Sequence, residues 1–294
     1  MRSEPIPPTD PRLASAWRRA PVFLLLRSLV LLLVLATPAP AADSTATSAG
    51  FEDNEELPTA GSLPQDGSVL PAVPTPFRPG ESLKFSVQYG FIKAGYAWLE
   101  VDKLKQADGH WVYELVARAE SNGFFDHVYK VRNRIESDWD STGHFSRRYA
   151  EDRREGHYKT KSEIRFDYDK QEALYGDGQT YPIPPGVQDA LSAFFYTRTQ
   201  ALPLGSSVYF DYHAGRKSQP IEVKVLGREH VKVPAGEFDC IAIEPVLKAG
   251  GIFKNKGRLV IWITDDERRM PVLMRSQVTI GSVSVLLVEV KPGS

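Results

Sequence analysis

Residues 83–91, LKFSVQYGF, decide the fold class, because apolar and polar or small side chains alternate along them. The side chains at the odd-numbered positions are large and apolar, and those at the even-numbered positions are small or polar. Alternation with a period of two is typical of a β-strand that has one apolar face and one face turned to water. The apolar face of this strand must therefore lie against a packed core or against a cavity that holds a ligand.

The same alternation recurs along the rest of the chain, and short stretches rich in Gly, Asp and Pro separate the segments. The segments are WVYELVARA (111–119), SEIRFDYD (162–169), SSVYFDYH (206–213), IEVKVLG (221–227), GRLVIWIT (257–264) and SVSVLLVEV (282–290). Strands do not alternate with long helices, which disfavours a parallel α/β sheet. The pattern predicts a mainly β fold: a large curved antiparallel sheet or an open barrel with one short helix.

The one predicted helix lies in PPGVQDALSAFFYTRTQALPLG, residues 184–205. Val187, Leu191, Phe194 and Phe195 fall at i, i+4, i+7 and i+8, which places them on one helical face. Two prolines precede this pattern, and a proline and a glycine follow it, as at the ends of a helix. We therefore expect a helix over residues 187–200 that packs on an open sheet or in a barrel mouth.

The N-terminal residues have the features of an export signal. Arg18, Arg19 and Arg27 supply positive charge, residues 28–36 (SLVLLLVLA) form an apolar run, and small residues at 39 and 41 suit a signal peptidase. The apolar run is shorter than the ~20 residues that a membrane-spanning helix needs. We expect a signal peptide over residues 1–41 and a mature protein in the periplasm or outside the cell. An uncleaved anchor remains the alternative.

Residues 42–76 are rich in Pro, Ser, Thr, Ala and Gly and carry acidic residues but no Lys or Arg. Such a segment has too little apolar surface to form a core, so we expect a disordered linker. Residues 77–294 then form a single antiparallel β domain. The whole chain has a formal net charge of −1, which gives no basic field to attract nucleic acid.

The sequence holds no recognisable catalytic or metal-binding motif. Its six histidines form no close pair of the kind that usually supplies zinc ligands, and no Gly-x-Ser-x-Gly segment occurs. The single cysteine, Cys240, lies in an alternating segment, where we expect a small core residue. Asp265 and Asp266 are adjacent, which fits a turn better than a glycosidase pair held across a sugar. We expect no cofactor, no metal and no enzyme activity.

Residues 146–161, SRRYAEDRREGHYKTK, form the most strongly charged tract. Acidic residues are interspersed among its Arg and Lys, so a solvated hairpin with ion pairs between its strands is the favoured interpretation. Contact with anionic lipid head groups or an anionic polysaccharide is the alternative.

Four segments together resemble a known family. They are PFRPGESLKFSVQYGFIKAGYAWLEV (76–101), DALSAFFYTRT (189–199), LGREHVKVPAGEFDC (226–240) and IWITDDERRMPVLMRSQVTIGSV (261–283). In this order they look like the bacterial exported family known as domain of unknown function 3108. The resemblance implies an exported, β-rich protein and supplies no catalytic residues. On architecture alone the predicted fold is also similar to periplasmic lipoprotein carriers, which shelter acyl chains between a curved sheet and helices; this analogy is weak evidence for function.

The leading functional hypothesis is a non-enzymatic envelope protein that binds a hydrophobic or amphiphilic ligand between the curved sheet and the helix. A twisted antiparallel sheet coils, and a helix of about 14 residues, ~21 Å long, cannot cover ten strands. The candidate lining residues are Tyr96, Trp98, Leu191, Phe194, Phe195 and Trp262, each of which would otherwise be ordinary core. The second hypothesis is a protein-interaction module in envelope assembly, and the third is a polysaccharide hydrolase.

Overall fold

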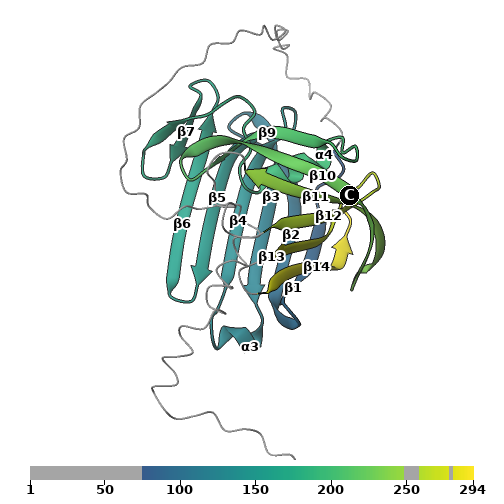
Figure 1. Ribbon diagram of the computed structural model, residues 1–294. Coiled ribbons are helices and arrows are strands. Elements are labelled where there is room, and N and C mark those ends of the chain that lie inside the picture. The colour runs from purple at the N-terminus through teal and green to yellow at the C-terminus, as the bar shows by residue number, and fades with distance from the viewer. Residues whose placement is uncertain (1–74, 248–257, 278–280) are drawn as a thin grey trace, which may run out of the picture.

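The computed structural model describes residues 75–247, 258–277 and 281–294. The expected signal peptide and nearly all of the expected linker lie outside these residues. The described chain folds into one antiparallel sheet of fourteen strands, which curves around a concave, apolar side (Figure 1). The predicted mainly β fold with a large curved antiparallel sheet is therefore confirmed.

The strands follow the chain in two runs of hairpins. The first run is β1 (Ser82–Tyr89), β2 (Ile92–Ala107), β3 (His110–Ser121), β4 (Arg132–Asp140), β5 (Ser146–Glu155), β6 (Tyr158–Asp167), β7 (Glu172–Tyr175) and β8 (Thr180–Pro182). The second is β9 (Ser207–Ala214), β10 (Lys217–Val233), β11 (Gly236–Leu247), β12 (Leu259–Thr264), β13 (Pro271–Gln277) and β14 (Ser282–Lys291). The sheet order is β8-β7-β6-β5-β4-β3-β2-β1-β14-β13-β12-β11-β10-β9, so the first and last strands pair at its centre.

Strand β1 has the alternation that its sequence predicts. Leu83, Phe85 and Val87 point to the concave side and are buried, whereas Lys84 lies on the convex side, where its amine approaches Glu289 of β14. The alternation ends at Tyr89, because Gly90 has a positive φ and turns the chain into β2. Phe91, which the alternating pattern places on the same face, lies in this turn instead and is exposed.

The two edge strands, β8 and β9, approach each other without forming a ladder. The Tyr175 hydroxyl is 2.8 Å from Nε2 of His213, and the Ser218 hydroxyl donates to the Pro182 carbonyl at 3.3 Å. Arg216, in the β9–β10 turn, pairs with Asp177 in the β7–β8 turn. Side chains and turns therefore bring the edges together at one end, and the sheet remains open.

The chain crosses from β8 to β9 through helix α4 (Ser192–Thr199), which is shorter than expected. The predicted start at residue 187 is wrong, because the main chain at Gln188 forms a bridge with Tyr212 of β9. The Gln188 amide donates to the Asp211 carbonyl at 2.9 Å, and its carbonyl accepts from the His213 amide at 2.8 Å. A residue whose backbone groups bond a neighbouring strand cannot also take part in helix hydrogen bonds.

A second helix, α3 (Gly123–Asp126), joins β3 to β4 and was not predicted. Its four residues are too few for a hydrophobic period, and its sequence signal is the N-cap Asn122, whose side chain accepts from the Phe125 amide at 3.0 Å. Among the described residues, no helix is both long and apolar enough to cross a lipid bilayer.

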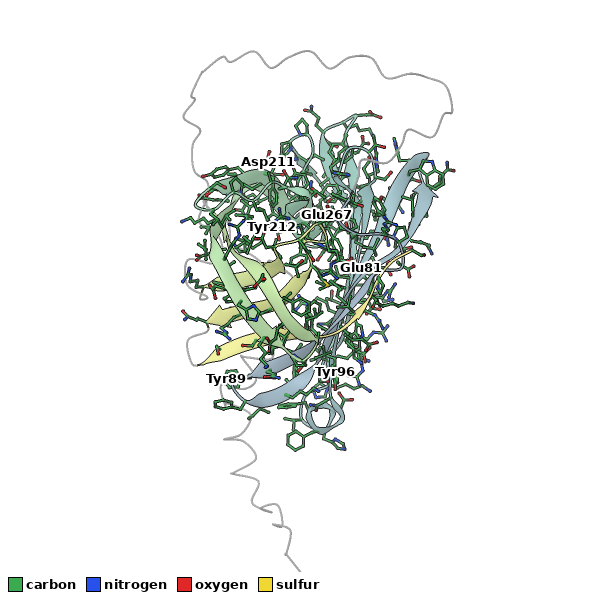
Figure 2. All side chains as sticks on the ribbon, turned by 90° about the vertical axis from the view of Figure 1, so that its right-hand side faces the viewer. Glu81, Tyr89, Tyr96, Asp211, Tyr212 and Glu267 are labelled. Carbon is green, nitrogen blue, oxygen red and sulfur yellow. The ribbon has the colours of Figure 1, made fainter. Side chains whose placement is uncertain are left out.

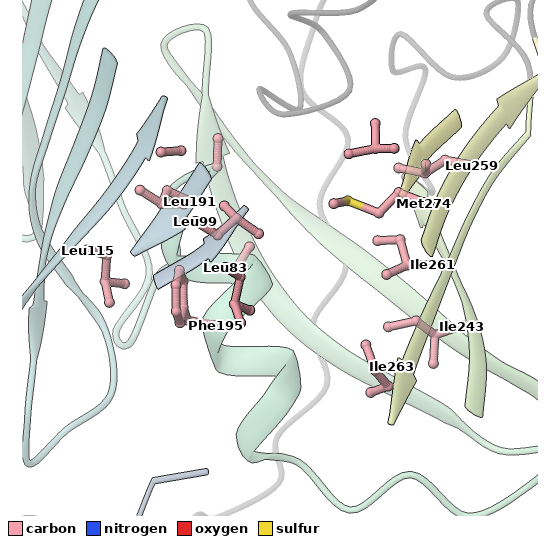
Figure 3. Packing of buried hydrophobic residues seen from close by; sticks show 14 of the residues in the cluster. Leu83, Leu99, Leu115, Leu191, Phe195, Ile243, Leu259, Ile261, Ile263 and Met274 are labelled. Atoms are coloured by element: carbon pink, nitrogen blue, oxygen red, sulfur yellow. The ribbon is translucent and has the colours of Figure 1, made fainter. Parts of the chain in front are cut away.

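The buried apolar side chains form one core, and Figure 3 shows some of those that lie on the concave side. Leu83, Leu99 and Leu115 of β1–β3 lie together with Leu191 and Phe195, whereas Ile243, Leu259, Ile261, Ile263 and Met274 of β11–β13 lie across from them. Cys240 is buried in β11, as expected for a small core residue, and burial raises the pKa of its thiol to about 12.

Candidate functional site

The candidate site is the space between α4 and strands β9–β12, and it begins with the way the N-terminus of α4 is held. Asp189 is fully buried, and its carboxylate accepts from the amides of Leu191 and Ser192, each at 2.8 Å. The Ser137 hydroxyl of β4 donates to the same carboxylate at 2.6 Å. Burial raises the pKa of Asp189, and these donors oppose the rise. The Asp189 carboxylate thus binds the two amides at the start of α4 and ties them to β4.

The C-terminal end of α4 is held by Arg198, whose side chain is almost completely buried. Its guanidinium pairs with Glu81, with Nη1 donating at 2.7 Å, and also donates to the carbonyls of Arg268 and Arg269 at 3.0 Å. The guanidinium carbon lies 4.9 Å from the centre of the Phe77 ring. Arg198 therefore links the helix to the residue before β1 and to the β12–β13 turn.

The two sides of α4 have different surroundings. Phe195 packs edge-on against Phe77 at 5.1 Å between ring centres, and it lies with Leu191 against β1–β3. Phe194, the preceding residue, turns towards β9–β12 and is only partly buried. Because both ends of the helix are held, the gap on the Phe194 side cannot be closed by simply shifting the helix.

That gap is an apolar groove. It contains about 440 Å³ of space not occupied by atoms, part of which is open to solvent. The centre of a water-sized sphere can occupy about 30 Å³ of this space, which is room for a water molecule or two. Its lining residues come from α4 and from four strands: Ala193, Phe194, Thr197, Arg198, Phe210, Ile221, Val223, Ile243, Pro245, Ile261 and Ile263. We refer to it as the α4 groove.

The polar side chains that line the α4 groove are already engaged within the protein. The Thr197 hydroxyl donates to the Ala193 carbonyl at 2.8 Å, and the Arg198 guanidinium is bound to Glu81. The groove thus offers a ligand apolar surface and shape, and it presents no free acid, base or nucleophile from this lining. Such a surface binds by removing apolar area from water.

Of the six expected lining residues, Phe194 alone lies in the α4 groove. Leu191 and Phe195 lie on the other side of α4, in the core. Trp262 lies on the convex side of β12, where the Arg275 guanidinium is 5.7 Å from the ring centre, while its neighbours Ile261 and Ile263 line the groove.

Tyr96 and Trp98 also lie on the convex side of the sheet, away from the α4 groove. Their ring centres are 6.2 Å apart, and the Lys84 amine lies 5.0 Å from the first ring and 5.8 Å from the second. The Arg118 guanidinium stacks on Trp98 at 4.9 Å and pairs with Glu100. The residues of β2 that face the concave side are the smaller ones between these aromatics, such as Ala97, which is buried.

Sequence reasoning missed Phe210, Ile221, Val223 and Ile243, which contribute most of the sheet side of the groove. The signal was present, because all four occupy apolar positions in alternating segments. What the sequence did not show is which strands lie opposite α4, since that depends on β9 and β10 forming the far edge of the sheet.

A second and larger hollow contains about 1250 Å³ of space not occupied by atoms, part of it open to solvent, against about 440 Å³ for the α4 groove. It is polar and lies over β4–β7 and the β9–β10 turn. It includes part of the charged tract 146–161, which forms the expected β5–β6 hairpin with an ion pair between its strands, Lys161 to Asp152 at 3.2 Å. A hydrogen bond from Arg154 lowers the pKa of Asp152 to about 2. Arg148 lies within ion-pair distance of Glu136 and Glu163. Opposite charges thus neutralise one another across this hollow, and no three potential metal ligands converge within the described residues.

The fold and the groove define an open, curved antiparallel β-sheet protein with a helix held across its concave side. The model of the family described as protein of unknown function DUF3108 matches residues 84–288, and the chain belongs to this family. Comparison of the sequence with the curated proteins gives no match.

Several solved structures are similar in part. A β-barrel-like protein of the domain of unknown function DUF1849 from Brucella abortus aligns with a TM-score of 0.48 at 7% identity, over 74% of this chain and 99% of its own. A protein from Parabacteroides distasonis, provisionally described as a lipoprotein, gives 0.32 at 10% identity over 74% and 98%. A protein from Bacteroides fragilis, provisionally described as exported and with a YmcC-like fold, gives 0.30 at 17% identity over 75% and 99%.

Proposed function

We propose that this protein is an exported, non-enzymatic protein of the cell envelope that binds the apolar part of a hydrophobic or amphiphilic ligand in the α4 groove. The observation that carries the proposal is the lining of the groove. Seven of its members are Phe, Ile or Val side chains, contributed by helix α4 and by the four strands that follow it along the chain. Apolar surface left partly open on a rigid support is typical of a binding site.

The groove as it stands holds only part of a ligand. The room between its walls is narrow, so a chain longer than a few carbons must displace the Phe194 side chain or extend along the side of the groove that is open to solvent. Phe194 is suited to this movement because it is partly buried and lies at the groove, whereas Phe195 is locked in the core. Each methylene group that enters would contribute about 0.8 kcal/mol.

Two further features support the proposal. The N-terminal sequence has the charge, apolar run and small residues of a signal peptide, which fits a protein of the periplasm or outer face of the cell. The one ionisable residue lining the groove, Arg198, is bound by Glu81 and by two carbonyls, so it supports the structure of the site rather than a reaction.

Titration with a fluorescent fatty-acid analogue tests the proposal. Wild-type protein should bind the probe, and Phe194→Asp should abolish binding, because the ligand would have to remove water from a carboxylate. Leu204→Asp is the matched control: Leu204 is an exposed apolar residue shortly after α4 that does not line the groove. Phe194→Ala should retain binding, because it widens the groove and keeps it apolar.

Circular dichroism of each variant separates loss of the site from loss of the fold. If folded wild-type protein binds neither this probe nor an apolar dye, the proposal is wrong. Equal binding by wild type and by a folded Phe194→Asp variant would place the ligand elsewhere.

The runner-up function, a protein-interaction module, is favoured by the free edge of β6. Strand β7 pairs only with residues 164–167 of β6, which leaves residues 158–162 without a ladder partner on that side among the described residues. An extended peptide of a partner protein can add a strand to such an edge. Lys161→Pro would remove one backbone donor from this edge, because Lys161 lies two residues before Glu163, whose carbonyl accepts from the Gly176 amide on the same side of β6. Loss of a crosslinked partner in this variant, while the fluorescent probe still binds as it does to the wild type, would favour this function.

A further inference from the structure

A second surface of the molecule carries unusual exposed apolar side chains, at the end of the sheet opposite the crossing that contains α4. Phe91 in the β1–β2 turn is fully exposed (104%), and Ile92 beside it is 57% exposed. Phe124 of α3 is 74% exposed, and Val128, just after α3, is 52% exposed. Single exposed apolar side chains are common on proteins, but a group of them on one surface marks an interaction site.

The two segments belong to one surface. The Asn122 side-chain amide donates to the Lys93 carbonyl at 2.6 Å, and the Asn122 backbone amide donates to the Ala94 carbonyl at 2.9 Å, which ties the start of α3 to the start of β2. The Gly156 amide donates to the Lys130 carbonyl at 2.8 Å, which joins the β5–β6 turn to the same end. Figure 1 shows α3 and the β1–β2 turn projecting together from this end of the sheet.

Positive charge surrounds the apolar tips. Lys93, Lys130 and Lys159 are exposed and come from the three connected segments. None of the three forms an ion pair with another described residue, although the Lys93 amine lies 4.3 Å from the centre of the Tyr96 ring. Figure 2 places Tyr96 and Tyr89 at this end of the molecule.

Each acidic group at this end has a basic neighbour: Asp126 and Glu155 form ion pairs, and Glu120 lies opposite Arg132 in the β3–β4 ladder. Asp126 of α3 accepts from Arg132 at 2.6 Å, and Glu155 is held by Arg153 at 2.8 Å and by Asn133 at 3.0 Å. Hydrogen bonding to Arg132 lowers the pKa of Asp126, so this carboxylate remains charged and bound to its partner. The three lysines therefore determine the sign of the charge that the surface presents.

We infer that this end of the sheet, the hairpin-end surface, docks on a lipid bilayer that contains anionic head groups. Its members are Phe91, Ile92, Phe124, Val128, Lys93, Lys130 and Lys159. The aromatic and aliphatic tips would enter the boundary between head groups and acyl chains, and the lysines would lie at the head-group level, with their stems along the apolar region. This function is separate from ligand binding in the α4 groove and does not depend on it.

The shape and the charge of the hairpin-end surface favour a lipid bilayer over another protein or a second copy of this chain. The apolar residues lie on projecting turns rather than on a flat patch, and a soft bilayer accommodates projections that a flat protein surface does not. In a symmetric dimer, each residue faces the same surface of its partner, so the lysines of the two copies would approach one another and repel. An anionic lipid surface matches these lysines instead.

The sharpest test labels the tip itself. The one native cysteine, Cys240, is buried, so Ile92→Cys provides the accessible thiol for an environment-sensitive NBD fluorophore. Lys217→Cys, in the exposed β9–β10 hairpin, is the control site. With phosphatidylcholine vesicles that contain phosphatidylglycerol, NBD emission at residue 92 should rise and shift to the blue and should be quenched by brominated lipid, whereas emission at 217 should not change. No change at residue 92 on vesicle-bound protein would overturn the inference.

Vesicle sedimentation of variants then tests the apolar contacts and the lysine contacts separately. The protein is used in the form recovered from cells. Phe91→Ser with Phe124→Ser should weaken binding at least tenfold, and the control Leu174→Ser with Leu226→Ser, which removes two other exposed apolar side chains, should not. Lys93→Glu with Lys130→Glu should weaken binding to the anionic vesicles by about fivefold or more for each lysine, ~1 kcal/mol each. Lys217→Glu with Lys224→Glu is the charge-matched control.

Two other outcomes would count against docking on a bilayer. Equal loss in the test and control variants would reduce the effect to total charge or hydrophobicity and would overturn the inference. A concentration-dependent dimer in sedimentation velocity that Phe91→Ser with Phe124→Ser dissociates, without vesicle binding by the wild type, would assign the surface to a second copy of the chain instead.

Discussion

Replacing Arg198 should release α4 from the sheet, and the cost can be worked out from its contacts. The guanidinium donates to Glu81 at 2.7 and 3.2 Å and to the carbonyls of Arg268 and Arg269 at 3.0 Å, in a site where the Arg198 side chain is 1% exposed. Arg198→Met removes the charge and leaves the Glu81 carboxylate, 11% exposed, without this partner. Breaking one side of a buried pair costs about 3–5 kcal/mol.

The free energy of unfolding, measured by urea titration with circular dichroism, provides the assay. Glu81→Gln should cost less, about 1–3 kcal/mol, because the amide oxygen still accepts from the guanidinium. Combining Arg198→Met with Glu81→Leu should recover part of the loss, since replacing both partners by apolar groups removes the unpaired charge. Arg154→Met, which removes an exposed partner of Asp152, should leave the urea midpoint nearly unchanged.

Two results would refute this reasoning about Arg198. One is a loss below about 1 kcal/mol in Arg198→Met, the level expected of a surface pair. The other is strict additivity of Arg198→Met and Glu81→Leu, because residues in contact should show a coupling energy. Either result would mean that the Arg198–Glu81 pair does not hold the C-terminal end of α4.

Three further predictions concern stability. His213 is buried, and burial lowers its pKa to about 4 from 6.5. As the pH falls, the unfolded chain therefore takes up a proton at this residue before the native protein does. The free energy of unfolding should be full above pH ~6.5 and should fall by about 2–4 kcal/mol towards pH ~4. In His213→Gln this part of the pH dependence should disappear, and an unchanged slope in urea titrations at stepped pH would contradict the assignment. Gly95→Ala would place a Cβ 2.0 Å from the Glu120 carbonyl oxygen, so β2 and β3 would have to separate. We expect this variant to have a lower melting temperature than the wild type. A higher melting temperature would show that the two strands lie farther apart than this distance. Phe195→Ala removes a ring that packs on Phe77 and should cost about 3–5 kcal/mol in unfolding free energy, whereas a cost near zero would mean that the core there collapses freely.

Local sequence patterns were sufficient for most of the sheet. Alternation at residues 83–89 placed Leu83, Phe85 and Val87 on one buried face, because the side-chain direction in a strand follows directly from the residue number. The start of α4 was not predictable in this way. At Gln188 a tertiary contact, the bridge to Tyr212 of β9, overrides the helical period of the apolar residues.

The candidate site was predictable only in part, because its lining also depends on which strands and faces the tertiary fold brings together. Aromatic size alone pointed to Tyr96, Trp98 and Trp262, yet these lie on the convex side, two of them under Lys84 and the third beside Arg275. Large rings on an exposed sheet face are covered by the stems and charges of neighbouring cations, and a single strand does not reveal which face that is. Phe194 was identified because it lies on the one predicted helix.

The most direct test of the account is native mass spectrometry of the protein recovered from the cell envelope, because the α4 groove is its central claim. We predict a wild-type population with the added mass of a bound amphiphile, the loss of that mass in folded Phe194→Asp, and its retention in Leu204→Asp. Wild-type protein that carries no added mass and takes up no fatty-acid analogue on titration would contradict the account. So would a bound mass that persists unchanged in folded Phe194→Asp.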